Sequence, residues 1–281
     1  MEKILEYFSN RELATIIWLI IIFSFALTKK SIRNSIGTVL IAFLKKKILT
    51  IIIAALIYSS AVVLILYKLK LWQLSFLKDS VYWYIMTALV ILFNLQDTSE
   101  NKNYFKDILF QNIQFMVIIE FIINIYSFSF WIELIFIPVF VLISFLTAYG
   151  EYYPEYKKVG EIGAVILSFI GFTLFTLSII HIIKSIEKYA NAVELKIFLL
   201  PIILSIAFIP FAYMTAIYME YEVLFARMKI FLPNKKLLRF AKRRLFFKKG
   251  LRLWKIKSMT PIIVKEFFSG ISKDEIKTVI K

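Results

Sequence analysis

The stretch ILTIIIAALIYSSAVVLILY, from Ile48 to Tyr67, decides the fold class of this chain. Its 20 residues include no charged side chain, and nearly all of them are apolar. A helix rises about 1.5 Å per residue, so about 20 residues cross the roughly 30 Å hydrocarbon core of a bilayer. The stretch therefore predicts a membrane-spanning helix.

Six further runs share this apolar character, and the whole chain is 60% hydrophobic against about 45–50% in soluble domains. With the first run, the predicted spans cover 13–28, 48–67, 81–95, 108–126, 130–148, 163–183 and 197–219. Only three residues separate the fourth run from the fifth, so these two form a tight hairpin or a re-entrant pair. We expect an all-α, polytopic bundle of about seven membrane helices over 1–219, followed by a smaller element over 220–281.

The positions of Lys and Arg predict the orientation of the bundle, because cytoplasmic loops hold the excess of these residues. With the N-terminus outside, 27 of the 35 Lys and Arg lie on the cytoplasmic side and 8 outside. The many Ile, Lys, Phe and Asn residues suggest an AT-rich bacterial genome. We therefore expect a multi-pass protein of a bacterial inner membrane, with its C-terminus in the cytoplasm.

The first loop, SIRNSIGTVLIAFLKKK from Ser31 to Lys47, has apolar residues at helical spacing. Its pattern predicts a short amphipathic helix that lies in the membrane interface. The alternative is that its second half is only the frayed start of the next span.

Residues 220–281 hold 17 Lys and Arg against 5 Asp and Glu, a net charge of +12 out of +16 for the chain. The stretch LRFAKRRLFFKKGLRLWKIK, Leu238 to Lys257, has no acidic residue, and Leu237, Ala241 and Leu245 give it an apolar helical face. Two short helices are expected after it: one at 261–269, where Thr260 and Pro261 mark the start, and one at 273–280, where Ser272 and Glu275 match the capping-box pattern. Residues expected to bind the membrane surface or a partner are Arg239, Lys242, Arg243, Arg244, Lys248, Lys249, Arg252 and Trp254. Anionic lipid headgroups are the expected partner, with a soluble protein as the alternative. Nucleic acid is disfavoured because no reading motif is present.

The sequence offers few of the residues and motifs that enzymes use for catalysis. The chain has no cysteine, and His181 is its single histidine, so a zinc site of several Cys or His ligands is excluded within one chain. It also lacks the phosphate-binding, zinc-protease and nucleophile-elbow motifs. We therefore expect neither an enzyme nor a cofactor.

Polar residues inside the fourth predicted span carry the main functional hypothesis. Asn112, Glu120 and Asn124 occupy one arc of a helix about 120° wide, with Glu120 about 18 Å along the span. A carboxylate at this depth costs several kcal/mol unless it faces protein or water, is paired, or is protonated. Glu120 therefore either lines a cation or proton path or is a protonated residue that binds a neighbouring helix.

Three other features bear on this hypothesis. Glu133 and His181 are expected near the outer interface, either as ordinary boundary residues or around an outer vestibule with Asn124. Pro210 should kink the last span, and this kink serves either as a hinge or only to shape the packing of the helices. Small residues on the sixth span, at Ala164, Ser168 and Gly171, predict a close helix contact within the chain or between subunits.

Two functions follow from these observations. The first is an oligomeric channel or pore for ions or small solutes, in which copies around an axis supply a ring of carboxylates. The second is a membrane anchor or effector subunit, whose basic cytoplasmic element docks a soluble partner or anionic lipid.

Overall fold

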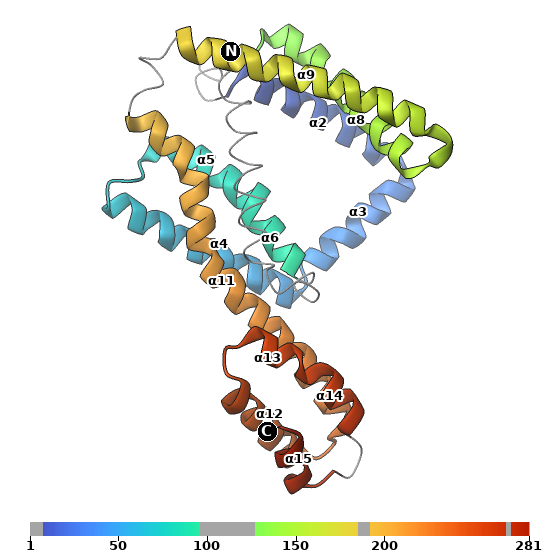
Figure 1. Ribbon diagram of the computed structural model, residues 1–281, viewed down its shortest axis with the longest axis vertical. Coiled ribbons are helices and arrows are strands. Elements are labelled where there is room, and N and C mark those ends of the chain that lie inside the picture. Colours follow the sequence, from blue (N-terminus) through green and yellow to red (C-terminus); the bar gives the residue numbers. More distant parts are fainter. Residues whose placement is uncertain (1–7, 96–126, 185–191, 268–270, 281) are drawn as a thin grey trace. The chain divides into compact units, whose positions relative to one another are not determined.

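The computed structural model describes residues 8–95, 127–184, 192–267 and 271–280, and within these ranges every regular element is a helix (Figure 1). Six helices in the described ranges are long and apolar enough to cross a membrane. They are Asn10–Thr28, Lys46–Lys68, Leu74–Phe93, Phe130–Tyr152, Pro154–His181 and Leu195–Phe231. The all-helical class is thus confirmed, together with six apolar helices of membrane-spanning length. The fourth predicted span, 108–126, lies outside the described residues, so the number of spans and their orientation stay predictions.

The chain divides into two compact units, and each is described by itself. The first holds residues 1–49 and 114–199, and the second holds residues 50–113 and 200–281. The division falls just inside α4 (Lys46–Lys68) and α11 (Ala192–Phe231), whose remaining lengths belong to the second unit.

In the first unit, α8 (Phe130–Tyr152) packs against both α2 (Asn10–Thr28) and α9 (Lys157–Lys184). The short helix η4 (Pro154–Tyr156) turns the chain between α8 and α9, which run antiparallel. Gly150 and Gly160 let the two backbones approach, because a Cβ on Gly150 would lie 2.6 Å from Gly160 Cα. The close contact is therefore made here and between Gly163 and Thr147, whereas a Cβ on Gly171 would meet nothing within 4 Å.

A separate helix, α3 (Lys30–Phe43), follows α2 after the single residue Lys29. None of its 14 residues is buried. The helix expected from the amphipathic pattern is present, and its position in a membrane interface stays a prediction.

The membrane helices of the second unit meet around Phe208 of α11. These helices are α4, α11 and four shorter elements, namely η1 (Leu74–Phe76), α5 (Leu77–Trp83), the π-helical turn η2 (Tyr84–Ala88) and α6 (Leu89–Phe93). The ring of Phe208 contacts the rings of Tyr58, Trp83 and Phe211. Ring hydroxyl and indole groups also donate across the helices, with Tyr58 Oη 2.9 Å from the Ala207 carbonyl and Trp83 Nε1 2.9 Å from Ser205 Oγ.

Pro210 lies inside α11, as the sequence predicted. Proline removes one hydrogen bond of the helix and disturbs the turn before it. The Ala207 carbonyl lies in that turn and accepts the hydrogen bond from Tyr58. The carbonyl that Pro210 leaves without its helical donor is that of Ile206. The bond from Tyr58 to the neighbouring Ala207 carbonyl therefore ties α4 to α11 beside the proline and does not replace the lost bond.

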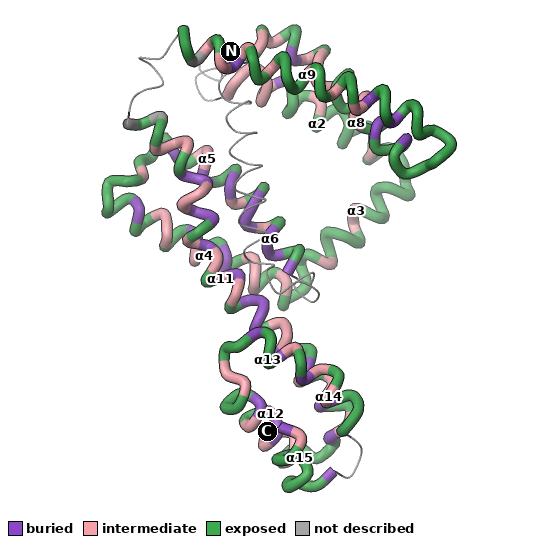
Figure 2. The backbone as a smooth tube through the Cα atoms, viewed as in Figure 1, coloured by how far each residue is buried: buried purple, intermediate pink, exposed green. Residues whose placement is uncertain are grey.

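Helix α11 continues beyond the predicted end of the last span at residue 219, and its 40 residues run to Phe231. Four helices follow: α12 (Lys235–Lys249), α13 (Leu253–Lys257), α14 (Met259–Glu266) and α15 (Lys273–Val279). They share a buried core with the end of α11, visible as the purple segments of Figure 2; its fully buried members are Leu224, Met228, Ala241, Leu245, Leu253, Ile256, Met259, Ile263, Ile276 and Ile280. The C-terminal element is therefore folded.

The two short helices expected in this element are both present. Around α15, the hydroxyl of Ser272 accepts from the Glu275 amide, and the Glu275 carboxylate accepts from the Ser272 amide at 2.6 Å, so the predicted capping box is confirmed. The other helix begins at Met259 with Ser258 before it, so the predicted start at Thr260 and Pro261 is wrong by two residues.

Candidate functional site

The candidate site is the basic surface of the C-terminal element, and α12 forms most of it. Asn234 caps the start of this helix, since its side chain accepts from the Lys236 and Leu237 amides. Gly250 ends it with a φ of +55°, a left-handed conformation that favours glycine. These two residues hold the cationic sequence between them as one helix of 15 residues.

The apolar side of α12 faces the protein, because Ala241 and Leu245 are fully buried. Ala241 and Leu245 are therefore unavailable to a membrane surface or a partner. A basic amphipathic pattern suits a membrane surface and a protein core equally well, and here the extended α11 supplies the core. What remains available is the opposite side of the helix.

That opposite side combines cations with aromatic rings. Phe247 is 81% exposed, and Phe246 is also exposed. Of the eight residues predicted to bind a membrane or partner, five are exposed, namely Arg239, Arg243, Lys248, Arg252 and Trp254, and three are half-buried, namely Lys242, Arg244 and Lys249.

Two of the half-buried cations are used inside the element. The guanidinium of Arg244 donates to the carbonyls of Ile280 and Lys277 at 3.1 and 3.0 Å, which fixes the end of α15 against α12. The ammonium group of Lys242 lies 4.7 Å from the centre of the Phe225 ring on α11. Both residues therefore serve the fold of the element.

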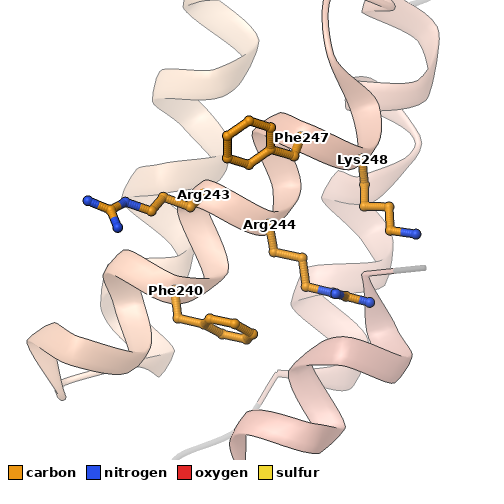
Figure 3. Close-up of a pocket in the computed structure, with 5 residues that line it drawn as sticks. All are labelled: Phe240, Arg243, Arg244, Phe247 and Lys248. Carbon is orange, nitrogen blue, oxygen red and sulfur yellow. The ribbon is translucent and has the colours of Figure 1, made fainter.

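An open hollow of about 530 Å³ lies on this surface, lined by Phe240, Arg243, Arg244, Phe247 and Lys248 (Figure 3). In Figure 3 the side chain of Arg243 points away from those of Arg244 and Lys248. The cations spread over the surface and do not converge on one point. Such an arrangement suits an extended anionic surface better than one small anion.

A further pair joins α13 to α11 near the predicted end of the last span. Lys257 Nζ lies 3.7 Å from Glu220 Oε1, and both side chains are largely buried. Burial lowers the pKa of Lys257 below its ordinary value of 10.5, and the Glu220 carboxylate opposes this shift.

Glu133 lies in the first unit, where it is fully buried. Its carboxylate accepts from Arg11 through Nε, at 3.1 and 3.0 Å, and through Nη2 at 2.9 Å, and from the Phe128 amide at 2.9 Å. The Asn10 side chain donates to the Phe128 carbonyl, and the Trp18 indole donates to the Leu134 carbonyl. Glu133 is thus buried within the first unit, where it joins α2 to α8, and its expected position near the outer membrane interface stays a prediction.

Arg11 is the functional candidate that sequence reasoning missed. It lies two residues after Ser9, within the capping box of Ser9 and Glu12, and just before the first predicted span. The available signal was a cation, Arg11, at the start of one apolar run and a carboxylate, Glu133, at the start of another.

The remaining predicted site residues are placed as follows. His181 is half-buried near the end of α9, and Pro210 lies inside α11. Asn112, Glu120 and Asn124 lie outside the described residues. Within the described ranges, no group of three or more His, Asp or Glu side chains could hold a metal ion.

Comparison with protein families, with curated proteins and with solved structures finds no match to this chain.

Proposed function

We propose that the protein is a membrane anchor that presents a folded, basic element to anionic partners at the cytoplasmic face of a bacterial inner membrane. The partner is a soluble protein with an acidic surface or the anionic lipid of the membrane itself. The observation that carries this proposal is the orientation of α12, which buries Ala241 and Leu245 and turns Arg239, Arg243 and Phe247 outward.

The charge of the element supports docking over a purely structural role. A fold of this size does not require 17 Lys and Arg against 5 Asp and Glu over residues 220–281. Like charges in a small element repel one another, and an excess of one sign speeds the approach of a partner of the opposite sign. Exposed aromatic rings between the cations add the anchors that protein interfaces favour.

Photocrosslinking in cells tests the proposal. A photoreactive phenylalanine at position 247 should trap a soluble protein or a phospholipid, because this side chain is 81% exposed beside Arg243. The same probe at Val264, which is exposed on α14, is the control. Arg239→Glu with Arg243→Glu should abolish the adduct. An adduct of equal yield at both positions, or one that survives the charge reversal, would refute docking at α12.

Conduction is the second candidate function, as an oligomeric channel for ions or small solutes. It is favoured by the arc of Asn112, Glu120 and Asn124, which places a carboxylate past the middle of an apolar run. In the described part of the chain, the Glu133 carboxylate is paired with Arg11, so the conduction hypothesis depends on Glu120.

Ion flux into liposomes that contain the purified protein tests conduction. Glu120→Gln should reduce the flux, whereas deletion of residues 232–281 should leave it in place while removing docking. Absence of flux from the wild-type protein would leave the anchor as the function, and a monomeric state would argue against a ring of carboxylates.

A further inference from the structure

The turn between α12 and α13 is held beside the membrane span by two tyrosines. Tyr221 Oη donates to the Gly250 carbonyl at 2.7 Å, and Tyr213 Oη donates to the Leu251 carbonyl at 3.0 Å. Tyr213 Oη also accepts from the Leu253 amide at 3.4 Å. The position of Leu251 along α11 is therefore fixed at the height of the Tyr213 hydroxyl.

That height lies inside the predicted membrane span. Tyr213 is six residues before the predicted end at residue 219, which corresponds to about 9 Å along a helix. Side chains on a helix also lean toward its N-terminus, which for α11 is the direction of the membrane. The same reasoning places Lys257, which pairs with Glu220, at the boundary of the span. The turn therefore reaches at least the headgroup layer.

The sequence of the turn suits that layer. Residues 246–255, FFKKGLRLWK, have no acidic side chain, and we call this segment the membrane tip. Four large apolar side chains are exposed on it, namely Phe246, Phe247, Leu251 and Trp254. Lys248, Arg252 and Lys255 are exposed between them. Exposed apolar side chains among cations are what interfacial membrane segments present.

The acidic side chains of residues 220–281 all lie outside the membrane tip in the sequence. Asp274 and Glu275 lie in the first turn of α15, which begins beside Phe240, where Lys273 Nζ is 4.9 Å from the ring. Phe240 is ten residues before Gly250, or about 15 Å along α12. Asp274 and Glu275 are thus kept away from the membrane tip, and Glu220, which is nearer to it, is paired with Lys257.

We infer that the membrane tip inserts its apolar side chains into the headgroup layer of the membrane that α11 crosses, and that its cations bind anionic phospholipid. This inference rests on the proposed function and names lipid as the partner of one end of the basic element. The outward face of α12 around Arg239 then remains available to a second partner.

Insertion can be measured directly, because the chain has no cysteine and single cysteines can be labelled. Leu251→Cys would carry an environment-sensitive fluorophore in the full-length protein, reconstituted in vesicles of phosphatidylcholine and phosphatidylglycerol. Ile230→Cys is the control, because Ile230 is an exposed aliphatic residue 17 residues beyond Tyr213, or about 25 Å along α11. Quenchers attached to lipid headgroups should act on position 251, and aqueous iodide should act on position 230. Equal iodide quenching at both positions would overturn the inference.

The lipid preference is tested with spin-labelled lipids in the same vesicles. Replacing Lys248, Arg252 and Lys255 by Gln should reduce the preference for phosphatidylglycerol over phosphatidylcholine by at least about fivefold, the attraction of roughly one surface cation. Replacing Lys229, Lys235 and Lys236 by Gln removes the same charge where α11 ends and α12 begins, away from the membrane tip, and should leave the preference unchanged. An equal effect of both triple variants would refute a site at the tip.

These outcomes are distinguishable from failure of the proposed function. Crosslinking of a soluble protein at position 247, together with iodide access to position 251, would keep docking and reject the membrane tip. Protection of position 251 without any preference for phosphatidylglycerol would reject the anionic partner.

Discussion

Replacing Arg11 by alanine should destabilise the first unit severely. The side chain of Glu133 is fully buried, and that of Arg11 is 14% exposed. With Arg11 removed, the hydrogen bond that the carboxylate retains among the described residues is the one from the Phe128 amide. The lost contacts are the close pairings of a planar guanidinium with both carboxylate oxygens, at 2.9 to 3.1 Å.

The expected magnitude follows from the asymmetry of buried ion pairs. Removing one partner of such a pair costs about 3–5 kcal/mol, because the other charge stays buried without compensation. Replacing both partners by uncharged residues of similar volume costs far less, since both charges leave the interior. Arg11→Met with Glu133→Gln should therefore recover most of the stability that Arg11→Ala loses.

The assay is reversible unfolding of the purified protein in mixed micelles of mild detergent and sodium dodecyl sulfate. Near-ultraviolet circular dichroism, to which Trp18 and Trp131 contribute in this unit, reports the transition. Arg11→Lys is the matched variant that keeps the charge and loses the planar two-point contact, so it should fall between wild type and Arg11→Ala. If Arg11→Ala lowers the unfolding free energy by less than about 1 kcal/mol, the pair does not hold α2 to α8 and the reasoning fails.

Two further predictions concern packing and pH. Gly150→Val should destabilise the contact of α8 with α9, because even a Cβ would lie 2.6 Å from Gly160 Cα, whereas Gly171→Ala should be tolerated because nothing lies within 4 Å of its Cβ; the melting temperatures in detergent compare the two. Hydrogen bonds from the backbone and side chain of Ser272 lower the pKa of Glu275 below its ordinary value of 4.5. The stability that the ionised Glu275 carboxylate provides through these hydrogen bonds is therefore present above pH 4.5. It is lost as the pH falls through the lower pKa that Glu275 has in the folded state. Hydrogen exchange of the α15 amides should accelerate in acid, and Glu275→Gln should remove much of that pH dependence, because the substituted side chain carries no titrating charge; an unchanged dependence in this variant would contradict the assignment.

Local features of the sequence predicted local features of the structure. The apolar run at 48–67 lies within α4, and the pattern at Ser272 and Glu275 gave the capping box of α15. Both depend on residues within a few positions of one another. The loop from Ser31 to Lys47 likewise predicted α3 from its own spacing.

Contacts between distant residues could not be predicted in the same way. Arg11 and Glu133 are 122 positions apart, and no property of either residue names the other. The burial of Ala241 and Leu245 was missed for a similar reason, because their core depends on α11 continuing past residue 219. A signal was present, since Leu224, Met228 and Leu232 extend an apolar stripe at helical spacing beyond the point where charge appears.

The continuity of α11 bears on both proposed functions. Pro210 lies one turn before Tyr213, the first residue that binds the C-terminal element, and Tyr58 contacts the Ala207 carbonyl on the other side of the proline. A helix at a proline lacks one of its own hydrogen bonds and bends there more readily than elsewhere. The attachments at Tyr213, Glu220 and Tyr221 then make the element move with the part of α11 that follows the bend. If a partner binds α12 as we propose, a bend at Pro210 would couple that binding to the membrane helices, so docking and conduction need not be alternatives.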